Sequence, residues 1–401
     1  MRMNDSMADT TKDIWNDSDG EEQPPKKRGK LGRFVLFFLT LTVVLAVVLV
    51  AAYRDGTGFD VLRRYLNYGI SSQEETEEGY HYDASAKNRF AALGDTLVVL
   101  SDTSLRLLDG SGAELWSETV QMDAPALVTG GGRAVAYGVG GKVLYVLDEN
   151  GLVGKLEADE DEPYIAATLN AEGWLAVTAE KKNYKGCVSV YNASLEKVFD
   201  FNSSRRFVTD AYVTDDCKRL AAVTLGQEGG TFISNVVLYD LKETEPMADY
   251  SITDGLVMSI GQMSGELVTV ADSRLTFADP SGEIQGEYTY GSEYLREFDC
   301  QGDGYVVLLL NRYQSGSVGR LVTVGTDGAE MASLDVNREI LSVSAAGRYI
   351  AVLYTDSLVV YNPDLQAYAT LEGTDAAKEA LVRQNGSALL IGSDAARLYL
   401  P

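Results

Sequence analysis

The stretch Leu105–Trp116, LRLLDGSGAELW, contains the signal that decides the fold of this chain. An apolar strand ends in an Asp-led turn with two glycines, and a second strand leaves that turn. Asp, Asn and Gly tolerate the positive φ angles of tight turns, so the stretch predicts a β-hairpin. The pattern occurs seven times, with turns that begin at Asp109, Asp148, Asn192, Asp240, Asp279, Asp327 and Asn362.

The turns are spaced by 35 to 48 residues, about 42 on average, which is the length of one four-stranded blade in a β-propeller. In each unit an apolar strand precedes the hairpin. A weaker apolar stretch, such as Ala126–Val128, comes before it and predicts an innermost strand that faces a central channel. No long segment with helical periodicity occurs between residues 80 and 372. The sequence therefore predicts an all-β domain over residues 79–401.

An eighth unit begins with Ala388–Ile391 and Arg397–Leu400, but the sequence ends at Pro401, before an outermost strand. An open blade would expose a strand edge, which promotes aggregation. The segment Tyr80-His81-Tyr82-Asp83 alternates like a strand. We expect it to supply the missing strand and close the ring, which gives an eight-bladed β-propeller. A seven-bladed ring is the alternative if one unit is degenerate.

Phe34–Tyr53 is a run of 20 uncharged residues, which as a helix is long enough to cross a bilayer. Five Lys/Arg residues lie just before it and three follow, which places the N-terminus in the cytoplasm. A cleaved signal peptide is the rival interpretation, but its apolar core would be too long. We therefore predict a disordered cytoplasmic tail (1–33), a transmembrane helix that binds the lipid bilayer (34–53), a juxtamembrane stalk (54–78) and an extracytoplasmic propeller at the cell membrane.

The formal net charge is −25, and residues 1–33 contribute nothing to it because their seven basic and seven acidic residues cancel. A propeller this acidic repels nucleic acid, so we exclude that partner. The three cysteines, Cys187, Cys217 and Cys300, are an odd number without short spacing, which fits neither a disulfide framework nor a zinc site. Cys187 and Cys217 could pair, but buried free thiols are favoured.

The repeats resemble those of quinoprotein-type (PQQ-like) and WD40-like propellers. Leu105–Trp116 carries the strand, the Asp-led glycine turn and the Trp, and Leu144–Leu156 is similar but lacks the Trp. The order of short tail, single span and acidic propeller also resembles an uncharacterised family of bacterial membrane-anchored propellers. That resemblance implies no catalytic residues that can be transferred to this chain.

Catalytic and metal motifs are scarce. With a single histidine, His81, the chain cannot build a Ser-His-Asp triad or a multi-histidine zinc site. It has no vicinal cysteines of the kind that quinoprotein dehydrogenases use, so we expect no cofactor. The acidic run Asp159-Glu160-Asp161-Glu162 lacks the spacing of a calcium loop, and we interpret it as a solvated loop.

Lys181, Lys182, Tyr184 and Lys185 form the one basic cluster of the domain and are our candidate partner-binding loop. We expect a non-enzymatic binding or scaffold module of the cell envelope that recognises a protein or glycan through propeller loops. The alternative is a carboxylate-dependent hydrolase or lyase acting on an envelope polysaccharide. It requires acidic residues with perturbed pKa values at the channel. A signal transducer that uses the tail as its output ranks last.

Overall fold

The computed structural model describes residues 30–55, 74–75, 79–253 and 255–401. The chain divides into two units, Met1–Phe59 and Asp60–Pro401. The first contains the helix α1 (Lys30–Asp55). Within the described part of the chain, no helix meets the length and hydropathy that a membrane crossing needs, so the predicted span Phe34–Tyr53 is not confirmed. Most of the predicted tail and stalk lies outside the described residues.

The described residues of the second unit form seven four-stranded antiparallel sheets and one five-stranded sheet, which confirms the predicted eight blades. Each of the first seven is a meander of strands that are consecutive in sequence. Blade 1 contains β3 (Arg89–Leu93), β4 (Thr96–Leu100), β5 (Ser104–Leu108) and β6 (Glu114–Thr119). Blade 2 contains β7 (Pro125–Gly130), β8 (Arg133–Gly138), β9 (Val143–Asp148) and β10 (Gly151–Glu157). Blade 3 contains β11 (Tyr164–Leu169), β12 (Leu175–Ala179), β13 (Cys187–Tyr191) and β14 (Lys197–Asn202).

The other blades follow the same plan. Blade 4 contains β15 (Phe207–Val213), β16 (Arg219–Glu228), β17 (Thr231–Asp240) and β18 (Pro246–Thr253). Blade 5 contains β19 (Val257–Met263), β20 (Glu266–Ala271), β21 (Arg274–Ala278) and β22 (Ile284–Thr289). Blade 6 contains β23 (Tyr294–Asp299), β24 (Tyr305–Asn311), β25 (Gly319–Gly325) and β26 (Glu330–Val336). Blade 7 contains β27 (Ile340–Ala346), β28 (Tyr349–Tyr354), β29 (Ser357–Tyr361) and β30 (Ala367–Glu372). Blade 8 contains β31 (Glu379–Val382), β32 (Ala388–Ile391) and β33 (Ala395–Leu400), with β1 (Glu74–Glu75) and β2 (Tyr80–His81).

The seven predicted turns form as expected, because each leading side chain bonds the backbone of its own turn. Asp109 Oδ1 accepts hydrogen bonds from the N–H groups of Ser111 (2.8 Å) and Ala113 (2.9 Å). Such local bonds satisfy the backbone and fix the register of the hairpin. The side chains of Asp148, Asn192, Asp240, Asp279, Asp327 and Asn362 accept equivalent backbone bonds.

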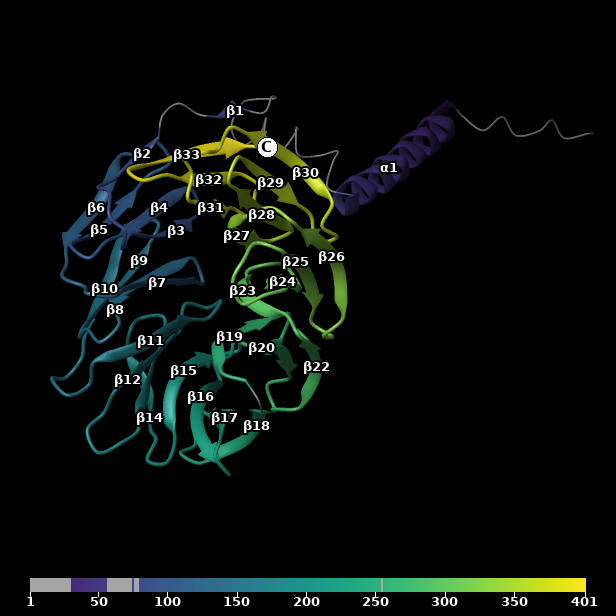
Figure 1. Cartoon of the computed structure of the whole chain (residues 1–401). Coiled ribbons are helices and arrows are strands. Elements are labelled where there is room, and N and C mark those ends of the chain that lie inside the picture. The colour runs from purple at the N-terminus through teal and green to yellow at the C-terminus, as the bar shows by residue number, and fades with distance from the viewer. Residues whose placement is uncertain (1–29, 56–73, 76–78, 254) are drawn as a thin grey trace, which may run out of the picture. The chain divides into compact units, whose positions relative to one another are not determined.

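The two ends of the propeller meet in blade 8, as predicted. In β2, Tyr80 pairs with Ala396 of β33 and His81 pairs with Ala395 (Figure 1). β1 lies inside the segment predicted as stalk and pairs with the far end of β33. Two short strands from the N-terminal side therefore complete the blade that the C-terminal residues begin.

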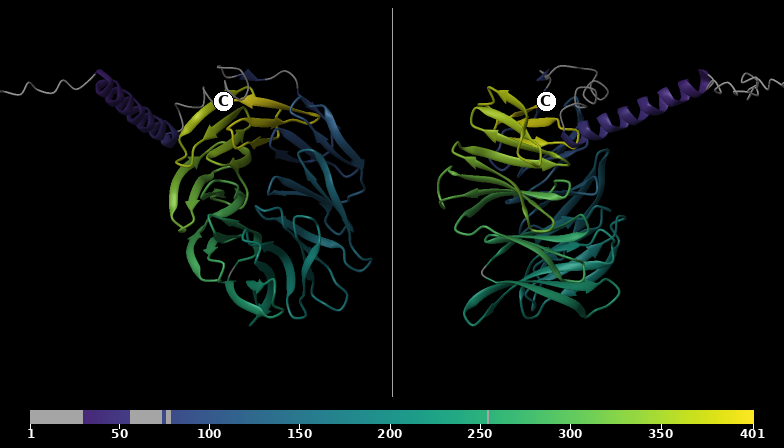
Figure 2. Two further views of the ribbon diagram at one scale, coloured as in Figure 1. Left: turned by 180° about the vertical axis from the view of Figure 1, so that it is seen from behind. Right: turned by 90° about the vertical axis from the view of Figure 1, so that its right-hand side faces the viewer.

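The core of the ring lies between the blades. Among the described residues, eight clusters of buried apolar side chains occur, and each joins two neighbouring sheets. One of them packs Tyr80 and Leu389 of blade 8 against Leu97 of blade 1, so the ring is closed by apolar burial as well as by strand pairing. The views from behind and from the side follow the blades around the ring (Figure 2).

One face of the ring carries the longest connections between described strands, among them residues 180–186 and 312–318. In every blade the first strand begins there, and the second and third strands are connected there. Loops of adjacent blades meet on this face: Gly140 N donates to Tyr164 O (2.7 Å), and Val208 N donates to Lys185 O (3.2 Å). We call it the loop face.

Blade 4 has the longest hairpin of the described sheets. Its second and third strands, β16 and β17, remain paired up to Glu228 and Thr231, with Gly229 and Gly230 between them. Consecutive glycines accept the positive φ that a tight hairpin turn requires, and both have it here (59° and 91°). The hairpin therefore continues beyond the start of β15 and adds surface to the loop face.

Candidate functional site

The predicted partner-binding loop lies between β12 and β13, on the loop face of blade 3. It meets the acidic run that precedes β11. Lys181 Nζ lies 2.9 Å from Glu162 Oε1, and Lys182 Nζ lies 3.5 Å from Asp161 Oδ2. The hydrogen bond to Glu162 raises the pKa of Lys181. The acidic run therefore neutralises two of the three lysines. It is not the purely solvated loop that the sequence suggested.

Lys185 differs from the other two lysines. Its Nζ lies 4.6 Å from the centre of the Phe207 ring, a cation–π contact, and it forms no ion pair with a described residue. Phe207 begins β15 of the next blade and is 56% exposed. Tyr184, beside Lys185 in the loop, is 45% exposed. The loop thus presents a cation without an ion-pair partner among the described residues. The exposed ring of Phe207 lies against this cation, and the exposed Tyr184 precedes it in the loop.

The long hairpin of blade 4 carries another exposed aromatic side chain, on the side of the sheet that faces blade 5. Phe232 is 65% exposed and lies two residues before Ser234, so the two side chains point to the same side. Ser234 Oγ donates to Gly255 O (3.1 Å), just before the first strand of blade 5, so Phe232 does not belong to the surface around Lys185. Arg205, by contrast, is exposed and precedes β15. We call Tyr184, Lys185, Arg205 and Phe207 the basic–aromatic patch.

Three carboxylates line the channel where blades 6, 7 and 8 adjoin. Glu297 and Asp299 come from β23, and Glu379 comes from β31. With Ser342, Ser344 and Lys378 they border a cavity of about 300 Å³. Burial raises the pKa of Glu297 to about 7 and that of Asp299 to about 6, and it also raises the pKa of Glu379. Acidic groups with perturbed pKa values therefore do converge in the channel.

Two of these carboxylates, Glu297 and Asp299, also hold neighbouring blades together. Glu297 Oε1 accepts from Val343 N (3.0 Å), and Asp299 Oδ2 accepts from Ala345 N (2.9 Å). The hydroxyls of Ser342 and Ser344 do the same for the N–H groups of Ala380 and Val382 in blade 8. The channel side chains thus satisfy backbone donors of the next inner strand, which is a structural role. No cluster of three metal-ligating side chains occurs among the residues that were placed.

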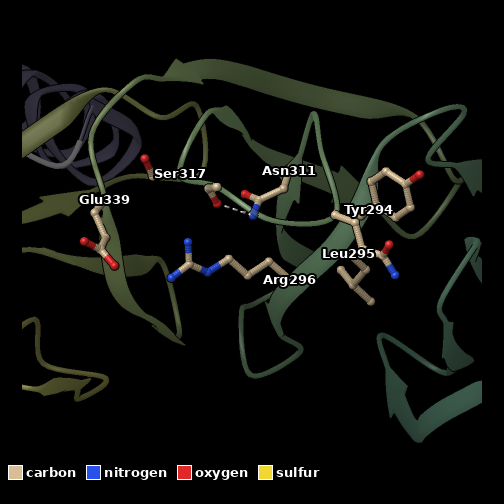
Figure 3. A pocket seen from close by; sticks show the side chains of 8 residues that line it. Tyr294, Leu295, Arg296, Asn311, Ser317 and Glu339 are labelled. Carbon is tan, nitrogen blue, oxygen red and sulfur yellow. Dashed lines mark hydrogen bonds between the residues drawn. The ribbon is translucent and has the colours of Figure 1, made fainter.

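A larger pocket, of about 540 Å³, opens on the loop face between blades 6 and 7 (Figure 3). Tyr294, Leu295 and Arg296 at the start of β23 line one side, and Asn311 lies at the end of β24. Gln314, Gly316 and Ser317 from the β24–β25 loop and Glu339 from the segment before β27 complete it. Sequence reasoning missed this pocket, because its residues come from three separate segments and form no motif.

The other predicted candidates occupy ordinary positions. His81 is exposed on β2, within the strand that closes the ring. Cys187, Cys217 and Cys300 are free thiols, so the possible pairing of Cys187 with Cys217 does not occur.

Solved structures with this architecture support the fold. The C-terminal WD40 domain of Sif2 aligns with a TM-score of 0.57 at 14% identity, over 82% of this chain and 97% of that one. The computationally designed Ika8 protein aligns with a TM-score of 0.54 at 13% identity, over 82% and 99%. The quinohemoprotein alcohol dehydrogenase ADHIIG from Pseudomonas putida HK5 aligns with a TM-score of 0.52 at 9% identity, over 80% and 75%. At these identities the likeness shows the fold alone, and it confirms the resemblance to PQQ-like and WD40-like propellers.

No curated protein shows significant similarity to the chain. Residues 62–372 match DUF5711, which is described as a family of unknown function. Because this match covers well over half of the chain, the protein belongs to the DUF5711 family.

Proposed function

We propose that this protein is a non-enzymatic binding module whose basic–aromatic patch recognises an acidic surface of a protein partner. The observation that carries the proposal is the free cation Lys185, held over the exposed ring of Phe207. The patch adds Arg205 and Tyr184, both exposed. Aromatic side chains and Arg are the residues that contribute most to protein interfaces.

The charge of the whole chain sharpens this choice of partner. With a net charge of −25, the protein repels acidic molecules over most of its surface. A cationic patch on such a background directs an acidic partner to one site on the loop face. The apolar rings then supply contact area that long-range charge attraction alone does not provide.

We further propose that α1 anchors the protein in the cell membrane, with the N-terminus in the cytoplasm and the propeller outside. Support comes from the uncharged run Phe34–Tyr53 and from the excess of Lys/Arg before it. The described side chains of α1 include exposed Val35, Phe37 and Leu45, which favour an apolar environment. Protease added outside intact cells tests the arrangement: it should remove the propeller and leave an epitope in residues 1–29 protected. Loss of the epitope would contradict the orientation.

The partner is tested with the tagged full-length chain, cross-linked in cells and extracted gently in detergent. We expect one partner in stoichiometric amount, and we expect its recovery to fall several-fold in the double variant Lys185→Glu, Phe207→Ala. Recovery should also fall with salt, since exposed charges are screened. Lys242→Glu and Met247→Ala are matched controls, because both residues are exposed near the opposite end of blade 4 and should leave recovery unchanged. A clean monomer, or equal losses in both sets of variants, would refute the proposal.

A second candidate function is a carboxylate-dependent hydrolase or lyase that acts on an envelope polysaccharide. The observation in its favour is the raised pKa of Glu297 and Asp299 beside the cavity of about 300 Å³. A carboxyl that keeps its proton near neutral pH is suited to general acid catalysis. Polysaccharide cleavage that is lost in Glu297→Gln, while the variant stays folded, would favour this function. The absence of cleavage by the unmodified protein would leave the carboxyls with their structural role.

A further inference from the structure

We propose that the pocket between blades 6 and 7 binds a saccharide. This goes beyond the binding of a protein at the basic–aromatic patch, because the two surfaces belong to different blades. The pocket volume of about 540 Å³ lies within the range of small-molecule sites. Its side chains, more than its size, specify the ligand class.

Two opposite charges face this pocket without neutralising one another. Arg296 extends toward Glu339 (Figure 3), yet neither forms an ion pair with a described residue. Arg296 is oriented by one bond, from Nη2 to Ile340 O (3.0 Å), which leaves most of its N–H donors available. Glu339 supplies acceptors only, when ionised. A ligand group that both donates and accepts hydrogen bonds satisfies both side chains, and a sugar hydroxyl is such a group.

Asn311 provides an independent observation. The residue is 6% exposed, and its Nδ2 donates to Gly316 O (2.9 Å). Its Oδ1 accepts no hydrogen bond from any residue that the structure describes. This oxygen is not enclosed by protein, so it is available to accept a hydrogen bond from a ligand donor in the pocket. The hydroxyl of Ser317 lines the pocket with Asn311 and adds a group that can donate or accept.

Tyr294 supplies the apolar contact that a sugar ring needs. It is 48% exposed at the start of β23 and lines the pocket. Its ring offers a flat apolar face to the C–H groups of a pyranose, while its hydroxyl stays in water. The polar side chains that line the pocket with Tyr294 then provide hydrogen-bond partners around a sugar ring that stacks on the tyrosine: Arg296, Asn311, Gln314 and Glu339.

Other ligand classes fit less well. Glu339 repels a phosphate or another anion, and the net charge of −25 adds to that repulsion. No group of three metal-ligating side chains exists in the described ranges. An apolar ligand would bury the charged Arg296 and Glu339 without partners, which is costly. A short peptide is the remaining competitor, and the experiment includes it.

The test uses the full-length chain in a detergent without a sugar headgroup. The probes are the β-1,4-linked tetrasaccharides of glucose and of N-acetylglucosamine, and a tripeptide Glu-Ala-Lys as the competitor. Calorimetry and ligand-observed NMR measure binding. We expect at least one tetrasaccharide to bind with a Kd below about 1 mM, and we expect Tyr294→Ala and Gln314→Ala each to weaken it about tenfold.

Tyr313→Ala is the matched control. Tyr313 lies in the same β24–β25 loop and is 64% exposed, but it does not line the pocket. Its replacement should leave the affinity unchanged, and thermal melting should show that all variants are folded. The proposal is overturned if no tetrasaccharide binds at about 10 mM. It is also overturned if binding is insensitive to Tyr294→Ala, or if only the tripeptide binds. Each of these results leaves the partner test at Lys185 unaffected.

Discussion

Glu297 Oε1 accepts a hydrogen bond from the backbone N–H of Val343, 3.0 Å away, and so joins the innermost strands of blades 6 and 7. The glutamate faces the channel and is only partly accessible to water. Burial disfavours its ionised form and raises its pKa to about 7. A group that titrates near neutral pH therefore sits at a contact between blades.

This predicts a stability that falls as pH rises. In the unfolded chain Glu297 ionises near its ordinary value of about 4.5, whereas in the folded protein it keeps its proton to about pH 7. Between these values the folded state binds more protons, so the free energy of unfolding decreases with increasing pH. Glu297→Gln keeps the acceptor for Val343 and cannot ionise. Between about pH 5 and pH 8, the unfolding free energy of the unmodified protein should therefore fall by on the order of 2 kcal/mol more than that of Glu297→Gln.

Urea unfolding followed by circular dichroism at both pH values measures this difference. The matched control is Glu283→Gln, because Glu283 is exposed in the β21–β22 turn and should leave the pH dependence unchanged. Equal pH dependence in the unmodified protein and in Glu297→Gln would show that Glu297 is ionised throughout.

Ring closure depends on Tyr80. The side chain is 1% exposed, and its hydroxyl accepts a bond from Arg383 Nη2 (3.1 Å) and donates to Asp95 O (3.2 Å). Tyr80→Ala should lower the free energy of unfolding by about 3–5 kcal/mol, since it leaves a cavity between blades 8 and 1. Tyr80→Phe should cost about 1 kcal/mol, because it removes only the hydrogen bonds.

The neighbouring residue provides the control for this prediction. His81 lies on the same two-residue strand but is exposed, so His81→Ala should change the unfolding free energy by less than about 0.5 kcal/mol. Thermal and urea unfolding measure all three variants. If Tyr80→Ala were as stable as His81→Ala, the N-terminal strand would not be what closes the ring.

The blade repeat could be predicted because its signals are local. Asp109 bonds backbone groups only two and four residues away, so one short stretch determines the turn wherever it recurs. The closing strand was predicted from topology, since an incomplete last blade requires one. The contact of Lys181 with Glu162 could have been predicted too, because the loop before an innermost strand and the loop between the second and third strands share a face.

The channel carboxylates and the pocket could not be found in this way. Glu297 and Val343 lie 46 residues apart, and their contact depends on how two blades are aligned. The chain has 59 acidic residues, so composition does not distinguish the few that enter the channel. The pocket likewise requires Tyr294, Asn311 and Glu339 to converge from three segments. Such sites depend on the packing of blades, which leaves no periodic pattern in the sequence.

The three cysteines should remain reduced. Cys187 is buried, and its Sγ lies 3.6 Å from Ala179 O. Burial raises the pKa of the thiols of Cys187, Cys217 and Cys300, which lowers their thiolate fraction and their reactivity. Alkylation followed by mass spectrometry should label three thiols after denaturation, and labelling of the folded protein should be slower than that of glutathione. A mass shift that corresponds to a disulfide between Cys187 and Cys217 would contradict this.

Adjacent blades also contact each other at their turns, and Gly286 tests how tightly. A Cβ atom at Gly286 in β22 of blade 5 would collide with the carbonyl carbon and oxygen of Asp327, in the turn of blade 6. Gly286→Ala therefore forces the two blades apart and should cost about 1–3 kcal/mol of unfolding free energy. Gly261→Ala is the control, because nothing lies within 4 Å of a Cβ atom there, and its stability should change by less than about 0.5 kcal/mol. Urea unfolding measures the stability of both variants. A loss of stability in Gly286→Ala alone would show that contacts between the turns of adjacent blades stabilise the ring. Equal stability of the two variants would show that the inner strands hold the ring together without these turn contacts.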